Sequence, residues 1–72
     1  MELRITQVNV WFAVQYGDNQ LTMLNQKSLV FHLKKFGFNT EQRADIVHMF
    51  ETYSTVVLNL ENKRVIFHVK VA

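Results

Sequence analysis

The segment Phe36-Gly37-Phe38-Asn39 constrains this chain more than any other, because it has the features of one helix ending and the next beginning. Asn25 is a suitable N-cap for a helix expected over residues 26–36. Gly37 stands where a left-handed C′ residue is needed, and Phe38 then takes the C″ position of a Schellman closure. The apolar stripe of this helix is expected to be Leu29, Val30, Leu33 and Phe36.

A second helix is expected to begin at Asn39 or Thr40, with Glu41 in its first turn, where a negative charge favours the helix dipole. About three residues separate the two helices, which predicts a compact helix-turn-helix pair. Its apolar face would comprise Ile46, Val47, Met49, Phe50 and Tyr53. Its polar face would comprise Glu41, Asp45, His48, Glu51 and Thr52.

Residues 3–16 are rich in β-branched and aromatic residues, which favours a strand. Leu3 and Ile5 are out of phase with the later apolar alternation, which predicts a bulge or bend near Thr6-Gln7. A helix remains an alternative for part of this segment, because several apolar residues also fit a 3.6-residue period. The later alternation comprises Val8, Val10, Phe12, Val14 and Tyr16.

Two hairpins are expected to flank the helical pair. In the first, residues 16–20 form a turn and residues 21–24 a short returning strand. In the second, Glu61-Asn62-Lys63 is the tip, and Asn62 is expected to adopt the left-handed conformation. Both arms of the second hairpin are expected to place their apolar residues on one face: Val56, Leu58 and Leu60, then Val65, Phe67, Val69 and Val71.

The order ββ-αα-ββ predicts an α+β fold, a single small domain over residues 1–72 with an antiparallel sheet packed by a helix-turn-helix-like pair. A winged helix is the alternative, because two helices followed by a hairpin match its second half. That architecture normally begins with a helix, whereas the first segment here favours a strand.

The composition narrows the function. A chain of 72 residues that is 49% hydrophobic has room for one core. It has no cysteine, and His32, His48 and His68 show no metal-ligand spacing, so we expect no metal and no cofactor. The core of so small a domain is marginal and would hardly sustain a catalytic cleft, so we expect no enzymatic activity. There is no apolar run of about 18 residues and no signal-peptide pattern, which predicts a soluble, cytoplasmic protein with no membrane contact. The net charge of +2 is too small to indicate a nucleic-acid partner.

Three surfaces carry the candidate binding residues. The first is the side of the first helix opposite its apolar stripe, where Phe31 lies among Lys27, Lys34 and Lys35. Either the N-terminal hairpin or Trp11 covers Phe31, or Phe31 is an exposed anchor for a protein partner.

The second surface is the polar face of the second helix, where Gln42, Arg43, Asp45 and His48 could contact a partner. Gln42 and Arg43 are of the types that read adenine and guanine, but the acidic residues on the same helix would repel phosphates. A solvated face, a protein-binding face and a DNA-reading face all remain open.

The third surface is a stripe on the last strand, where Arg64, His68 and Lys70 alternate beside Val57 and Ile66. It would protect an edge strand from aggregation, form a dimer surface, or touch phosphates through Arg64 and Lys70 together with Arg43.

In size, in its Asn/Gln/Lys/Phe-rich composition and in the helical stretch KSLVFHLKKFGFNTEQRADIVHMFE, the chain resembles small regulatory proteins of temperate phages, of the modulator-of-repression or antirepressor type. The resemblance implies a protein of the bacterial host cytoplasm that binds a repressor, typically at its DNA-binding domain. We therefore expect a non-enzymatic regulator that occludes a protein partner. The alternatives are a winged-helix-like DNA-binding regulator, an anti-restriction or anti-CRISPR inhibitor, and a structural subunit.

Overall fold

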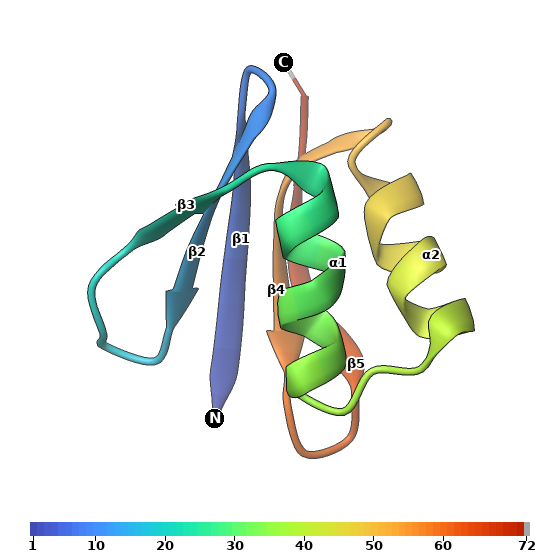
Figure 1. Cartoon of the computed structure of the whole chain (residues 1–72). Coiled ribbons are helices and arrows are strands. Elements are labelled where there is room, and N and C mark those ends of the chain that lie inside the picture. Colours follow the sequence, from blue (N-terminus) through green and yellow to red (C-terminus); the bar gives the residue numbers. More distant parts are fainter. Residues whose placement is uncertain (72) are drawn as a thin grey trace.

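The computed structural model describes residues 1–71, which form five antiparallel strands and two helices (Figure 1). Both helices lie on one face of the sheet. This confirms the α+β fold and the helical pair between two strand-rich halves. In chain order the elements are β1 (Glu2–Val8), β2 (Trp11–Tyr16), β3 (Thr22–Leu24), α1 (Gln26–Lys35), α2 (Thr40–Met49), β4 (Tyr53–Asn59) and β5 (Arg64–Lys70).

The strand order β3-β2-β1-β4-β5 places β1 at the centre of the sheet. Leu3 and Ile5 of β1 face Tyr16 and Val14 of β2 on one side, and β4 pairs along the other side. The second hairpin is therefore part of the main sheet rather than a free wing. The order of the elements also differs from a winged helix, because three strands precede α1.

The first segment contains a turn that the sequence analysis did not predict. Asn9 and Val10 connect β1 to β2, with Val8 paired to Trp11 and Asn9 at φ 57°. The change of apolar phase that predicted a bulge near Thr6-Gln7 is caused by this reversal of the chain. The turn also makes the expected common face wrong, because Val8 and Val10 are exposed. The helix alternative is wrong as well.

The core lies between the sheet and the helical pair. Phe12 of β2 and Phe50, which follows α2, meet edge to face with ring centroids 5.1 Å apart, an arrangement favourable for aromatic pairs. The other buried members of the core cluster are Leu3, Ile5, Val14, Leu29, Leu33, Phe38, Ile46, Val56 and Leu58. No residue of β5 belongs to this buried cluster.

The helix ends follow the predicted capping. Asn25 Oδ1 accepts a hydrogen bond from Ser28 N at 2.8 Å, which caps α1. At the other end, Gly37 N donates to Lys34 O and Phe38 N donates to Leu33 O, the two bonds of a Schellman closure. α1 ends at Lys35, with Phe36 as its C-cap.

The helix α2 begins at the first of the two expected caps and ends earlier than its apolar face suggested. Asn39 and Gln42 form a reciprocal capping box, with both bonds at 2.8 Å. The last residue of α2 is Met49, and Tyr53 opens β4 instead of extending the helical face. Neither helix among residues 1–71 is long and apolar enough to cross a membrane.

The second hairpin differs from expectation in its tip and in its faces. Lys63, not Asn62, has the positive φ, at 60°. A register shift separates the pairs Val57–Phe67 and Leu58–Val65, which leaves Ile66 as an extra residue in β5. The apolar residues of β5 are therefore divided between the two faces of the sheet, and all seven residues of β5 are exposed.

We predict that Gly37→Ala lowers the free energy of unfolding by about 1–2 kcal/mol, because a side chain strains a left-handed backbone. Gly37 has φ +91°, and an added Cβ would lie 3.3 Å from Lys63 Cε. Gly37→Asn should cost less, since asparagine tolerates positive φ. Urea unfolding of the three proteins measures the difference, and an equal loss in both variants would contradict this explanation.

Candidate functional site

The orientation of α1 fixes the outward position of Phe31. Leu29 and Leu33 of α1 are fully buried against the sheet, and at 100° per residue Phe31 then points away from it. The Phe31 side chain is 60% exposed. Trp11 does not cover it. Trp11 precedes buried Phe12 in β2, and successive strand residues point to opposite faces, so Trp11 lies on the sheet face away from the helices. The alternative in which the hairpin or Trp11 covers Phe31 is therefore wrong.

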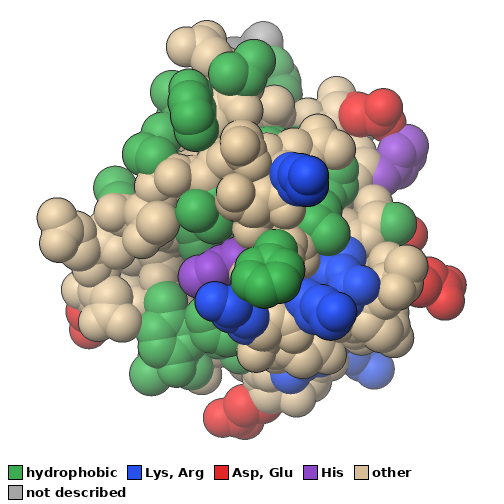
Figure 2. All heavy atoms as spheres, viewed as in Figure 1, with side chains coloured by type: hydrophobic (Ala, Val, Ile, Leu, Met, Phe, Trp, Pro, Cys, Tyr) green, Lys and Arg blue, Asp and Glu red, His purple; other side chains and the backbone are tan. Residues whose placement is uncertain are grey.

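Three exposed lysines surround Phe31 on the same helix, and Figure 2 shows Lys and Arg side chains gathered around hydrophobic atoms on this face. Lys35 Nζ lies 5.1 Å from the centroid of the Phe31 ring, within the range of a cation–π interaction. Lys27 and Lys34 are one helical turn before and after Phe31. We call these four residues, Lys27, Phe31, Lys34 and Lys35, the α1 patch. The residues of α1 include no acidic side chain, so the patch is uniformly positive.

His32 lies beside the α1 patch and is half-buried. Its ring packs edge to face on Phe36, with centroids 5.1 Å apart. Burial, reinforced by the positive charge of Lys35, lowers the pKa of His32 from its ordinary value of 6.5. The imidazole therefore resists adding a further positive charge to the patch.

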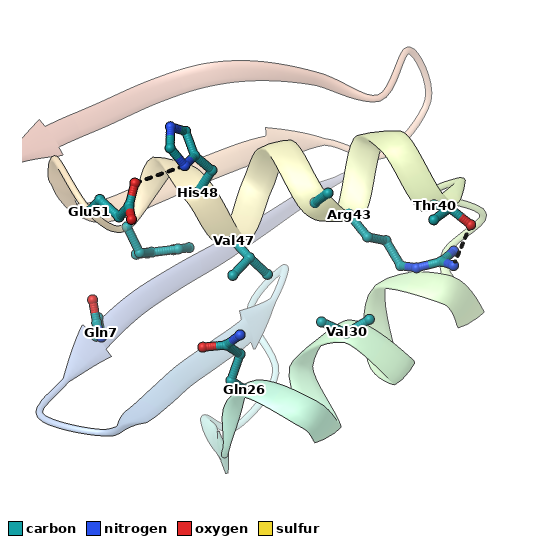
Figure 3. A pocket seen from close by; sticks show the side chains of 10 residues that line it. Gln7, Gln26, Val30, Thr40, Arg43, Val47, His48 and Glu51 are labelled. Atoms are coloured by element: carbon teal, nitrogen blue, oxygen red, sulfur yellow. Dashed lines mark hydrogen bonds and ion pairs between the residues drawn. The ribbon is translucent and has the colours of Figure 1, made fainter.

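A groove of about 630 Å³ runs between α1 and α2 (Figure 3). Val30 and Val47 face each other across it from the two helices, which makes part of its wall apolar. The complete lining is Gln7, Gln26, Val30, Thr40, Arg43, Ala44, Val47, His48, Phe50 and Glu51. Sequence reasoning missed this groove, because its wall combines residues from two helices whose packing the pattern does not specify. Val30 is only partly buried, because it lines this groove.

Gln42 and Arg43 have structural roles that compete with reading bases. The Arg43 guanidinium donates to the carbonyl of Phe38 and, at 3.2 Å, to Thr40 Oγ1, so it fastens the connection between the helices. Gln42 Oε1 accepts from Asn39 N in the capping box. Both side chains are thus held against their own helix terminus.

Asp45 and His48 lie with Glu41 on exposed parts of α2. His48 Nδ1 is 2.8 Å from Glu51 Oε2, and both side chains are more than two-thirds exposed. A polar contact this exposed contributes little to stability. The helical layer is therefore divided by charge, with basic residues on α1 and acidic residues on the outward side of α2.

The three predicted phosphate contacts do not converge. Arg64 pairs with Asn59, which also pairs with Glu2, so Arg64 belongs to the sheet face away from the helices. Lys70, at the other end of β5, pairs with Tyr53, which packs against the core. Arg43 belongs to the helical layer. The three positive charges occupy different parts of the surface.

Within residues 1–71 there is no cluster of three or more His, Cys, Asp or Glu side chains that could hold a metal ion. Comparisons of the chain with known protein families, with curated proteins and with solved structures gave no match.

We predict that Phe31→Ala changes the free energy of unfolding by no more than about 0.5 kcal/mol, because an exposed side chain contributes little to packing. Leu33→Ala, two residues away and fully buried, should cost about 2–5 kcal/mol. Chemical denaturation of both variants measures this contrast. A loss in Phe31→Ala as large as that in Leu33→Ala would place Phe31 in the core.

The lowered pKa of His32 predicts a loss of stability in mild acid. As the pH falls through the ordinary value of 6.5, the unfolded chain takes up a proton that the folded chain resists, so the free energy of unfolding decreases. His32→Gln should show a shallower decrease between about pH 7 and pH 5.5. Urea titrations across that range test it, and identical slopes would refute the assignment to His32.

Proposed function

We propose that this chain is a non-enzymatic binding protein that docks on a protein partner through the α1 patch and occludes part of that partner's surface. The observation that supports this proposal is the 60% exposure of Phe31 within a rim of lysines. Large aromatic side chains that are exposed in the free protein and rimmed by polar groups are typical of binding anchors.

The chemistry of the α1 patch defines its partner. Phe31 requires an apolar pocket, and the three lysines require acidic groups around that pocket. A standard interface buries about 800 Å² per partner, whereas the whole chain exposes 4971 Å². The contact would therefore extend beyond the patch, and the groove beside Val30 is its natural continuation.

A regulatory role follows if the covered surface is one that the partner needs for its own activity. On the basis of the resemblance to phage regulators, we propose that this partner is a repressor in the bacterial cytoplasm. The DNA-binding surface of a repressor is basic, so it would complement Glu41 and Asp45 on α2 better than the lysines of α1. The α1 patch instead fits an acidic surface of such a partner. An anti-restriction or anti-CRISPR inhibitor would act by the same occlusion.

The DNA-binding alternative has less support from the geometry. Gln42 and Arg43 are engaged in the cap of α2 and the helix connection. Arg64 and Lys70 lie at opposite ends of β5. A DNA contact through these residues would therefore require both local rearrangement and a strongly curved docking surface.

Affinity capture with quantitative mass spectrometry tests the proposal, using the lysate of the organism that encodes the chain. We predict that wild type retains a protein that Phe31→Ala retains at least about tenfold less, the scale of an interface hot spot. Asp45→Ala is the matched control on α2 and should retain the same protein. Binding should weaken much less at raised salt than DNA binding would, because the anchor is apolar and only the contacts of the lysines are screened.

Two results would contradict the proposal. A partner lost with Asp45→Ala but kept with Phe31→Ala would move the docking surface to α2. Fluorescence anisotropy with duplex DNA provides the other comparison. Tight binding to DNA that weakens steeply as salt rises would favour the DNA-binding alternative.

A further inference from the structure

β5 is a long and open edge of the sheet. It lies at the end of the strand order, and all seven of its residues are exposed. The opposite edge, β3, has three residues. An edge strand presents unpaired N–H and C=O groups that another extended segment can pair with, and short edges are a common protection against this. Only the β3 edge has that protection.

β5 is also more apolar than a protected edge requires. Val65, Ile66, Phe67 and Val69 are between 39% and 52% exposed, so each keeps a large part of its side chain in water. None of them belongs to the buried core cluster, which takes its sheet residues from β1, β2 and β4. A partner beside β5 would remove this apolar surface from water.

The hydrogen bonds toward β4 show which backbone groups of β5 are directed outward. Val69 O accepts from Ser54 Oγ at 3.3 Å, and Val71 N donates to Thr52 O at 3.1 Å, so both residues face β4. In an antiparallel pair, alternate residues direct their backbone groups to opposite sides of the strand. The N–H and C=O groups of His68 and Lys70 therefore point away from the sheet.

The side chains near this end of β5 alternate between apolar and basic. Phe67 and Val69 pair with Val57 and Thr55, which places them on the sheet face away from the helices. His68 lies on the helix side, where its ring is 4.1 Å from that of Tyr53. Lys70 pairs with Tyr53 and lies on the same side.

We propose that β5 is a second docking surface, which adds an extended segment of a protein partner in which apolar and acidic residues alternate. Strands place successive side chains on opposite faces, so one register sets the apolar residues beside Phe67 and Val69. The same register sets the acidic residues beside His68 and Lys70. Backbone hydrogen bonds give such strand addition its affinity, and the alternating side chains give its specificity.

A second copy of this chain is a poorer occupant of the edge. Residues 62–71 contain no acidic side chain, so self-pairing joins two basic strands. Antiparallel pairing centred on Phe67 places Arg64 opposite Lys70 at both ends. The neighbouring registers bring His68 opposite Arg64 or opposite its own copy, and neither places an acidic side chain opposite a basic one. Like charges directly opposite each other destabilise a strand pair, whereas an acidic segment removes this repulsion.

Anisotropy of a labelled eight-residue peptide of alternating Val and Glu tests the proposal. We expect saturable binding, and none by a peptide with Lys in place of Glu. Lys70→Glu should weaken binding about fivefold or more, the factor that corresponds to a surface charge pair. A peptide with its four Val and four Glu in separate blocks should bind more weakly, because it lacks the alternation.

Two further measurements distinguish strand addition from general attraction to positive charge. The amide protons of His68 and Lys70 should exchange more slowly when the peptide is bound, because the peptide then accepts hydrogen bonds from them. His68→Pro removes one outward N–H without removing a donor to β4, and it should abolish binding. Circular dichroism checks that this variant is folded. Phe31→Ala should bind the peptide as wild type does, which separates this proposal from the α1 patch.

Three results would overturn the proposal. One is the absence of peptide binding to the folded wild-type protein. Another is binding in which the protected amides lie on α1 and those of His68 and Lys70 stay unprotected. The third is a dimer in sedimentation of the peptide-free protein with these two amides already protected, which would make a second copy the occupant.

Discussion

The pairing of β1 with strands on both of its sides is the constraint on which the rest of the structure depends. β1 joins β2, its neighbour in sequence, to β4, which follows both helices. Leu3 and Ile5 are fully buried where they meet Val56 and Leu58. Burial of such side chains stabilises a small domain by roughly 1.5–3 kcal/mol each. Without this long-range pairing the two halves of the chain would share no sheet on which the helices could pack.

The single-sided packing of the helices determines which surfaces remain available. One sheet face and the inner faces of α1 and α2 form the core, so the outer face of α1 and the edge of β5 are left exposed. A domain of this size has too few elements to cover both surfaces. Exposed apolar side chains occur at both places, and the charges around them differ in arrangement. Phe31 has a ring of lysines, whereas β5 alternates apolar and basic residues.

The helix ends were predictable because their signals are local. Asn25, Asn39 and Gly37 each act within three residues of their own position, and the structure confirms the caps and the Schellman closure. The turn at Asn9-Val10 was not predicted, since no glycine marks it and Asn9 supplies the positive φ alone. Within the candidate site, the lysine rim of Phe31 followed from helical spacing. The structural roles of Gln42 and Arg43 did not, because they depend on how the connection between the helices closes.

By itself, the sequence determined the α+β class, the helical pair and the opposition of Phe31 to the stripe of Leu29 and Leu33, because each follows from the period of a local element. Only the tertiary structure decided that Phe31 is exposed, because exposure depends on whether another element covers it. It also decided the faces of β5, since the extra residue Ile66 shifts the pairing with β4. A pattern along one strand defines alternation, but the partner strand defines the register, and one inserted residue reverses the face of every side chain beyond it.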